Sequence, residues 1–477
     1  MRKLLILGLA VMLAGAACTD DDEDMLGDTG GEAGEGDGPG AAGRAGGSPA
    51  AGSPAAGSPA AGSPAAGSPA AGSPAAGSGG AAGSTSSGPK NIVETAVAAG
   101  SFKQLAAALG KANLVEALSA PGPFTVFAPT DAAFDAFEKA NPGALAKLSV
   151  EDLTKILKYH VLSGAAVKST DLKNGQLAKT LAGPAVAVDL SGDKPKVGGA
   201  TVSMADIEAS NGVIHVIDAI LMPPKDIVET ALAAGKFTTL AKALTDAGLV
   251  DTLKGAGPFT VFAPTDDAFK KLAAVPSGDA LKNVLLYHVV SGQAGPLDLK
   301  DKGVLTTVAG SPALVDTSDG VKVAGAKVSL PNVVASNGVI HVVDSVLLPP
   351  DKDIVETAVA AGSFTKLAAA LQSAGLVDAL KAKGPFTVFA PTDAAFNALS
   401  AVPSGDALKN VLLYHVVMGA VGAGDLKAGD VPTLLADEQL EIDLSGGVKV
   451  NDAKVSMANI VTKNGVIHVI DKVLVPN

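Results

Sequence analysis

The residues best suited to chemistry in this 477-residue chain are its six histidines, which fall into two recurring sequence patterns. Three of them directly follow a tyrosine, and three lie in the sequence Asn-Gly-Val-Ile-His-Val. One histidine of each kind per copy could together hold a zinc ion. The two members of a pair are 53 or 55 residues apart, however, with no His-x-x-x-His on a helix and no fixed third ligand, so we expect no metal. The positions are Tyr159-His160, Tyr287-His288, Tyr414-His415, His215, His341 and His468.

A structural role explains these histidines better. His215 shares one face of a predicted strand with Val213 and Ile217, and a histidine in such a place is usually buried and hydrogen-bonded. The neighbours of the first tyrosine–histidine pair, Leu157 and Val161, would also pack into a core. We therefore expect His215 and its equivalents to belong to the core, whereas the Tyr-His pairs have two interpretations, as core residues or as binding residues.

Patterns typical of catalysis are missing. The chain has no Gly-x-Ser-x-Gly elbow and no phosphate-binding Gly-x-x-x-x-Gly-Lys-Ser/Thr loop. Asp131, Asp266 and Asp393 each stand in the first turn of a predicted helix, where a carboxylate interacts favourably with the helix dipole. We assign these aspartates a structural role and expect neither an enzyme nor a cofactor.

The charge and the amino-acid composition limit the classes of binding partner that we expect. The formal charge is −12, and only Arg2 and Arg44 are arginines, so the chain beyond residue 44 has no guanidinium to read guanine edges or clamp phosphates. Nucleic acid is therefore excluded as an expected partner. The chain also has no tryptophan and three tyrosines, which disfavours stacking platforms for sugars.

The N-terminus indicates export. Arg2 and Lys3 precede an apolar run, 4–17, that is too short for a standard transmembrane helix, and Cys18 follows it. This segment resembles a bacterial lipoprotein signal, which is cut before the cysteine that then carries the lipid, although Gly15 stands where that pattern usually has leucine. The alternative is an ordinary secretory signal cut near Ala17.

Residues 18–87 predict a spacer. Nine acidic residues fall within 19–37, and a Gly-Ser-Pro-Ala-Ala repeat follows. Such a segment cannot bury enough apolar surface to offset the entropy of ordering it, so we expect a disordered linker.

The rest of the chain contains three copies of one unit. Phe-Thr-Val-Phe-Ala-Pro-Thr-Asp begins at Phe124, Phe259 and Phe386. The period of 126–135 residues is long enough for each copy to be a domain with its own core. The predicted domains are 88–223, 224–350 and 351–477, after a signal peptide at 1–17 and the linker at 18–87.

Within a copy, helices come first and strands follow. Asn91 and Glu94 form a capping-box pattern at a helix start, and helical spacing continues to Tyr159, apart from the strand that begins at Phe124. Residues 164–221 are short β-prone runs broken by glycine, proline and aspartate. This order predicts an α+β fold with a mostly antiparallel sheet.

Taken together, the Phe-Thr-Val-Phe-Ala-Pro-Thr-Asp motif, the Tyr-His pair and Asn-Gly-Val-Ile-His-Val resemble the signatures of the fasciclin domain family. The three motifs occur in the same order three times over about residues 88–477. The resemblance implies a β-wedge packed with several helices. It also implies cell adhesion, matrix attachment and surface scaffolding without catalysis.

The resemblance also implies candidate adhesion residues. In animal members of the family the Tyr-His pair is linked to integrin binding, which marks Tyr159, His160, Tyr287, His288, Tyr414 and His415. A second family motif is Asp-Ile before the last strand. The first copy has Asp206-Ile207, whereas the others have Asn332-Val333 and Asn459-Ile460 and so lack the carboxylate.

We therefore predict a non-enzymatic adhesion protein anchored through lipid on Cys18 at the bacterial cell surface or outer membrane. Expected partners are surface or matrix proteins or polysaccharide, with self-association as a further possibility and the lipid as the sole membrane contact. The alternative function is a secreted binding module for a small apolar ligand or polysaccharide. The alternative locations are the periplasm and the medium.

Overall fold

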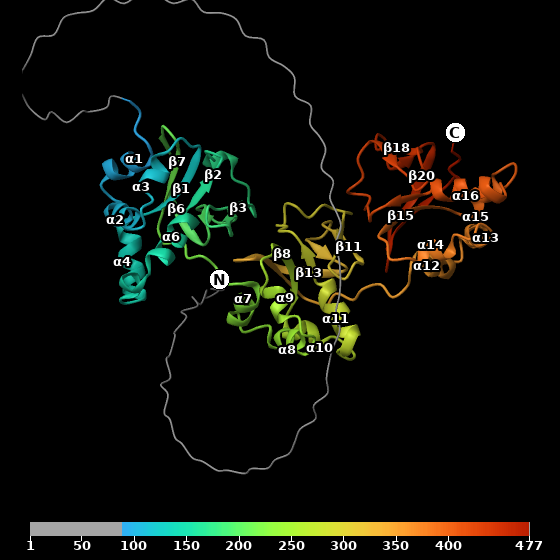
Figure 1. Ribbon diagram of the computed structural model, residues 1–477, viewed down its shortest axis with the longest axis horizontal. Helices are drawn as coiled ribbons and strands as arrows, with labels where there is room; N and C mark the ends of the chain where they lie inside the picture. Colours follow the sequence, from blue (N-terminus) through green and yellow to red (C-terminus); the bar gives the residue numbers. More distant parts are fainter. Residues whose placement is uncertain (1–87, 477) are drawn as a thin grey trace, which may run out of the picture. The chain divides into compact units, whose positions relative to one another are not determined.

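The computed structural model describes residues 88–476, which form three repeats of the same architecture (Figure 1). The predicted signal peptide, Cys18 and the predicted linker lie outside the described residues. The first repeat contains the helices and strands α1 Ile92–Ala99, α2 Lys103–Lys111, α3 Val115–Ser119, β1 Phe124–Pro129, α4 Asp131–Ala140, α5 Ala144–Lys147, α6 Val150–Tyr159, β2 Val161–Ser163, the 3₁₀ turn η1 Ser169–Asp171, β3 Leu177–Lys179, β4 Ala185–Asp189, β5 Lys196–Val197, β6 Ala200–Ala209 and β7 Gly212–Ile217.

The other repeats follow the same order of elements. The second repeat contains α7 Ile227–Ala233, α8 Thr238–Asp246, α9 Val250–Lys254, β8 Phe259–Pro264, α10 Asp266–Lys270, α11 Gly278–Tyr287, β9 Val289–Ser291, β10 Val304–Thr306, β11 Pro312–Asp316, β12 Lys322–Val323, β13 Ala326–Ala335 and β14 Gly338–Val343. The third contains α12 Ile354–Ala361, α13 Thr365–Ser373, α14 Val377–Lys381, β15 Phe386–Pro391, α15 Asp393–Asn397, α16 Gly405–Tyr414, β16 Val416–Met418, β17 Gly429–Pro432, β18 Gln439–Asp443, β19 Lys449–Val450, β20 Ala453–Thr462 and β21 Gly465–Ile470.

Each repeat is built on one seven-stranded sheet. In the first repeat the strand order is β2-β1-β7-β6-β5-β4-β3, and the other two repeats have the equivalent order. The central strands β1 and β7 run parallel, with Val126 opposite Ile214, and every other neighbouring pair is antiparallel. The predicted α+β class and the mostly antiparallel sheet are confirmed.

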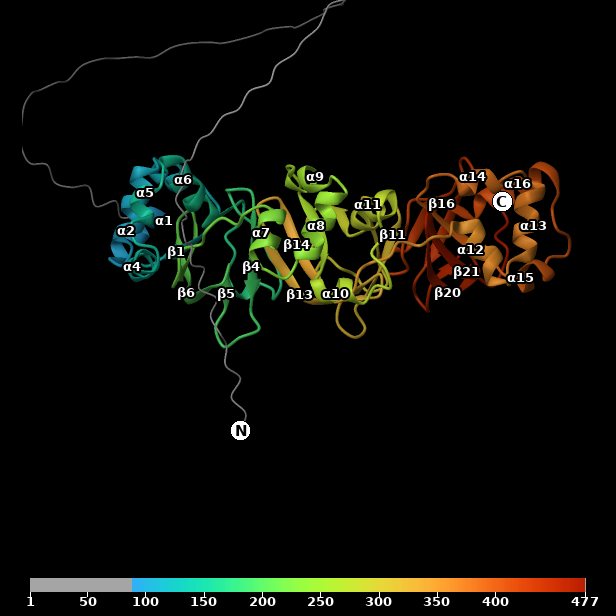
Figure 2. The same cartoon turned by 90° about the horizontal axis from the view of Figure 1, so that it is seen from below.

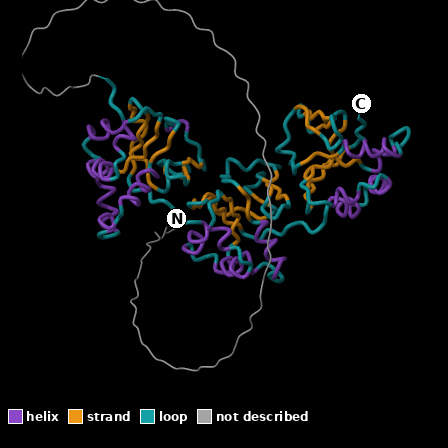
Figure 3. The backbone as a smooth tube through the Cα atoms, viewed as in Figure 1, coloured by secondary structure: helices purple, strands orange, loops and turns teal. Residues whose placement is uncertain are grey.

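Two apolar clusters stabilise each repeat, because successive residues of a strand point to opposite faces of the sheet. Val126 and Ala128 of β1 face the helices, which gather on one side of the strands (Figure 3). Phe127, between them, faces the second cluster together with Val186 and Ile217 from the antiparallel part of the sheet. Figure 2 shows α2 and α4 at one end of the first repeat and β4 and β5 at the other.

The first repeat differs where its sequence is longer. Its α4 has ten residues, whereas α10 and α15 have five each, and α5 has no counterpart. Seven additional residues between the helix phenylalanine and the Tyr-His pair thus lengthen one helix and add another.

Asn211, the first residue of the Asn-Gly-Val-Ile-His-Val motif, joins the helices to the sheet. Its side-chain oxygen accepts the Ile92 N–H at the start of α1, and its amide donates to the carbonyls of Leu118 and Ala120 at the end of α3. Gly212 follows because a Cβ there would lie 2.1 Å from the Phe124 carbonyl oxygen. The motif therefore satisfies helix-end groups that would otherwise be buried without partners.

Candidate functional site

The Tyr-His pairs lie inside the protein. Tyr159 is the last residue of α6 and His160 is its C-cap, and their exposed fractions are 5% and 2%. The Tyr159 hydroxyl donates to the Ala185 carbonyl at 2.9 Å, and burial raises its pKa to about 12. In the other repeats Tyr287 and Tyr414 make the equivalent bonds to Pro312 and Gln439.

The histidine of each pair joins the helix end to the segment after the last strand. The Leu221 N–H donates to His160 Nε2 at 2.9 Å, so the ring proton is on Nδ1, which donates to the Ile156 carbonyl at 2.8 Å. Burial lowers the pKa of His160 to about 4, as it does for His288 and His415. Each of these rings is neutral at pH 7 and has both nitrogens engaged.

The second histidine of each repeat is also buried. His215 stacks on Phe127 with ring centroids 5.7 Å apart, and its Nε2 lies 2.9 Å from the Val167 carbonyl oxygen. Phe262–His341 and Phe389–His468 stack in the same way. Among residues 88–476, no group of three histidine, cysteine or acidic side chains is arranged to hold a metal.

The Asp-Ile motif forms an irregular stretch of β6. The pairing of β6 with β7 shifts register between Met204 and Ile207, and Asp206 there has φ of 60°. Asn332 and Asn459, at the same place in the other repeats, have φ of 59° and 64°. Aspartate and asparagine are the non-glycine residues that best tolerate this left-handed conformation, so the backbone explains why only these two types occur here.

Asp206 and Ile207 face different surroundings. The Asp206 carboxylate accepts the Ser169 N–H at 2.7 Å and the Ser169 hydroxyl, and these hydrogen bonds lower its pKa. About a third of the side chain (34%) is exposed. Ile207 instead packs against the cluster beneath the helices. Within the Asp-Ile motif, therefore, the Asp206 carboxylate reaches the surface.

β6 carries two further exposed features, one on each side of Asp206 in the sequence. Met204 is 59% exposed, and Lys168 forms an ion pair with Glu208 at 2.8 Å. We call Lys168, Met204, Asp206 and Glu208 the Asp206 patch. Sequence reasoning missed Met204, although an apolar residue two positions before Asp206 in a strand with one polar face was the available signal.

In the second and third repeats the equivalent amides bond to the preceding repeat. Asn332 Nδ2 donates to the Gly175 carbonyl at 2.8 Å, and Asn459 Nδ2 donates to the Lys302 carbonyl at 3.0 Å. An ionised carboxylate cannot donate such a bond. The change from aspartate to asparagine therefore goes with a change of partner, from Ser169 within the first repeat to a carbonyl of a neighbouring repeat.

The aspartates assigned to helix starts have a second role. Asp131 accepts the Gln104 N–H at 2.8 Å, at the start of α2, and Asp266 accepts the Thr239 N–H at 2.7 Å, at the start of α8. Asp393 accepts the Lys366 N–H at 2.8 Å, at the start of α13. Neither α2 nor α8 has a side-chain cap of its own. Each aspartate therefore stands in the first turn of one helix and caps another.

No helix within the described range 88–476 is long and apolar enough to cross a membrane. The predicted lipidation site, Cys18, lies outside that range.

Comparison with known proteins identifies related chains. Human periostin is 29% identical over 379 residues, which cover 76% of this chain and 45% of periostin. The pig transforming growth factor-beta-induced protein ig-h3 is 31% identical over 389 residues, covering 79% and 56%. The chain thus spans about half the length of these curated relatives. Protein sll1483 of Synechocystis sp. is 48% identical over 134 residues, covering 28% of this chain and 73% of that protein.

A solved FAS1 domain pair from the insect cell adhesion molecule Fasciclin I matches with a TM-score of 0.26 and 18% identity, covering 53% of this chain and 98% of that structure. The family model described as the fasciclin domain matches residues 100–223, 235–349 and 362–476. These three stretches make up most of the chain, and each contains one copy of the helix-and-sheet unit described above except for its first helix. The chain therefore belongs to the fasciclin domain family.

Proposed function

We propose that this protein is a non-enzymatic cell-surface adhesion protein, which displays three fasciclin domains to surface or matrix proteins or to polysaccharide. The observation that carries the proposal is the Asp206 patch, where two hydrogen bonds hold a partly exposed carboxylate two residues after an exposed methionine in β6. The Asp206 side chain loses little conformational entropy when a partner binds, because its hydrogen bonds already order the carboxylate. Membership of the fasciclin family supports the same function.

The buried Tyr-His pairs enter this proposal in an indirect role. Their polar atoms are engaged within each repeat, so a partner at the surface would not touch them. They hold the end of α6 against the strands and the segment after β7, and so maintain the relative positions of the elements that form the surface. In the proposal Asp206 makes contact with the partner, whereas Tyr159 and His160 position the surface.

The proposed architecture places the domains at 88–223, 224–350 and 351–477 on a lipid-anchored linker. The apolar run before Cys18 supports the anchor, and an ordinary secretory signal, giving a periplasmic or secreted protein, is its rival. Three domains on one chain would raise avidity where partner sites match their spacing.

The test of this function is attachment of intact cells to bare, protein-coated and polysaccharide-coated surfaces. We expect attachment to fall when the chain is deleted, and to fall equally with Cys18→Ala, which removes the proposed site of lipidation. Clumping in suspension that is lost on deletion would identify self-association as the mode of adhesion. Unchanged attachment on every surface by the deletion strain would refute the proposal.

The first testable prediction concerns the patch itself. Asp206→Asn keeps a residue that the second and third repeats tolerate in the same backbone conformation, so the fold should survive while the charge is lost. We expect attachment to drop several-fold. Asp193→Asn, which removes an exposed carboxylate from the loop between β4 and β5, is the matched control. Equal attachment by the two variants would place the contact elsewhere.

The alternative function, binding of a small apolar ligand, is favoured by an apolar cavity in the second repeat.

A further inference from the structure

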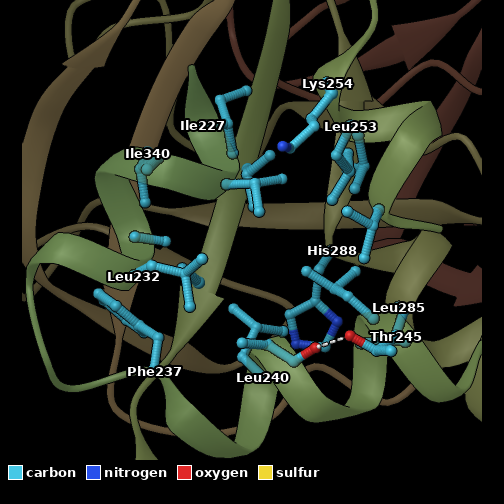
Figure 4. Close-up of a pocket in the computed structure, with 18 of the residues that line it drawn as sticks. Ile227, Leu232, Phe237, Leu240, Thr245, Leu253, Lys254, Leu285, His288 and Ile340 are labelled. Atoms are coloured by element: carbon cyan, nitrogen blue, oxygen red, sulfur yellow. Dashed lines mark hydrogen bonds between the residues drawn. The ribbon is translucent and has the colours of Figure 1, made fainter. Parts of the chain in front are cut away.

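The second repeat contains an apolar cavity that is far smaller in the other two repeats. The cavity has a volume of about 300 Å³ and lies between α7, α8, α9, α11 and the strands β8 and β14 (Figure 4). Leu240, Leu253, Leu285 and Ile340 are among the residues that line it. At the same place in the first and third repeats the cavities measure about 20 Å³ each.

The cavity is not explained by a different apolar lining, because the core residues around it are shared among the repeats. The lining differs from that of the third repeat at three positions on α7 and α8, and from that of the first at these and at Lys254. Leu232 replaces a valine found in both other repeats and is 54% exposed, and Lys242 replaces an alanine. Thr245 takes the place of glycine in the first repeat and glutamine in the third.

The helix that borders the cavity is also held less firmly. In α1 and α12 the capping box is complete, whereas Asp226 at the start of α7 accepts its bond from Glu229 without the reciprocal one. In the third repeat Lys381 of α14 further ties the start of α12, through contacts of 3.9 Å to Asp353 and 3.6 Å to Glu356.

Lys254 is the residue equivalent to Lys381, but its side chain has different contacts. It forms no ion pair within 4.0 Å in the described part of the chain, and its side chain turns toward the cavity, as Figure 4 shows. The other polar groups of the lining are engaged. Lys242 pairs with Asp246, and the Thr245 hydroxyl donates to the Ala241 carbonyl. His288 uses both ring nitrogens, for Val284 and Leu347.

We propose that the second repeat binds a medium-chain fatty carboxylate, with its alkyl chain in this cavity and its carboxylate on Lys254. An apolar cavity of about 150 Å³ stays dry and holds benzene, so one of this size suits an alkyl chain of roughly eight to ten carbons. The apolar lining selects the chain. The ammonium at the mouth selects an anionic head over a neutral one, and it can stay in contact with water while it does so.

The proposal is tested by calorimetric titration of the purified full chain with hexanoate, octanoate and decanoate, and with decanol as the uncharged analogue. We expect one site per chain and a gain in affinity of about fourfold per added methylene until the cavity is filled. Decanoate should bind about fivefold tighter than decanol, since an ion pair at an exposed mouth contributes modestly. Three equivalent sites per chain, or no saturable binding, would overturn the proposal.

Matched variants locate the site. Lys254→Met should abolish the preference for decanoate over decanol, while Lys381→Met in the third repeat should leave it unchanged. Ala241→Phe, which adds a ring inside the cavity, should weaken both ligands at least tenfold, and circular dichroism checks that it is folded. Binding that is the same in Lys254→Met and Ala241→Phe as in the wild type would refute the site. The outcome is independent of cell attachment, so this inference and the adhesion proposal can fail separately.

Discussion

At the scale of single residues, the polar groups of the motifs form buried hydrogen bonds that connect distant parts of each repeat. His160 bridges the end of α6 and Leu221, which are far apart in the sequence, and Tyr159 reaches the Ala185 carbonyl in β4. A buried ring that must remain neutral makes stability depend on pH, because the unfolded chain takes up a proton that the folded chain refuses.

The second prediction is that each repeat becomes less stable as the pH falls from 6.5 towards 4. Burial lowers the pKa of His160, His288 and His415 from 6.5 to about 4. Their contribution is therefore complete above pH 6.5 and is lost as the unfolded state protonates. The loss should reach about 3 kcal/mol per repeat, at about 1.4 kcal/mol per pH unit.

Urea unfolding between pH 7 and pH 4.5 measures this loss, in a range where most carboxylates keep their charge. His160→Gln, which cannot titrate, should be less stable at pH 7 but should flatten the pH dependence of the first repeat alone. A free energy of unfolding that stays constant between pH 6.5 and pH 4.5 would contradict the neutral assignment of these rings.

At the scale of elements, helices in this fold are capped from outside themselves. Asp266 begins α10, and it also accepts hydrogen bonds from the Thr238 hydroxyl and the Thr239 N–H at the start of α8. Partial burial raises the pKa of Asp266, but the hydrogen bonds from Thr239 and Thr238 outweigh this effect and lower it overall. The two helices are thereby fastened at one point.

The third prediction compares two adjacent aspartates. Asp266→Ala should lower the free energy of unfolding of the second repeat by about 1–2 kcal/mol, the usual cost of losing a helix cap. Asp267→Ala should change it by less than about 0.5 kcal/mol, since its side chain is 84% exposed and pairs with Lys270 at the surface. Thermal unfolding of both variants is the measurement, and equal destabilisation would show that the cap across helices contributes nothing.

At the scale of the whole molecule, neighbouring repeats are joined by more than the connecting chain. Between the second and third repeats, the Val304 N–H donates to Asp425 at 2.7 Å and the Ser311 hydroxyl donates to the Lys463 carbonyl at 2.8 Å. Gly424 comes so close to the second repeat that a Cβ would lie 1.9 Å from the Asp301 carbonyl oxygen. Each repeat nevertheless keeps its own two apolar clusters.

The fourth prediction follows from that close approach. Gly424→Ala should loosen the joint between the second and third repeats and leave both folded, because the clash lies outside their cores. Gly446→Ala is the control, since a Cβ there meets nothing within 4 Å. Small-angle X-ray scattering should give a larger radius of gyration for Gly424→Ala alone. The same radius for both variants would mean that the joint tolerates the methyl group.

Much of the fold could be predicted from sequence, because its signals are local. The capping box at Asn91 and Glu94 marks the start of α1, and alternation over Phe124–Pro129 marks β1. The assignment of His215 and its equivalents to the core also agrees with their burial. The Asp206 position was harder to interpret, since its left-handed backbone depends on how β6 pairs with β7 rather than on neighbouring residues.

The repeat, the order of elements and the family can be inferred from the sequence alone, because periodicity, caps and motifs each lie within a short stretch of chain. Which polar groups meet depends on the tertiary structure. Asp266 caps a helix that begins 28 residues earlier, and Asn332 finds its partner 157 residues away. It also decided that one of three almost identically lined helical cores is hollow. Packing depends on the position of each whole helix against the sheet. Small differences in helix caps and surface ion pairs can shift that position without changing the apolar pattern.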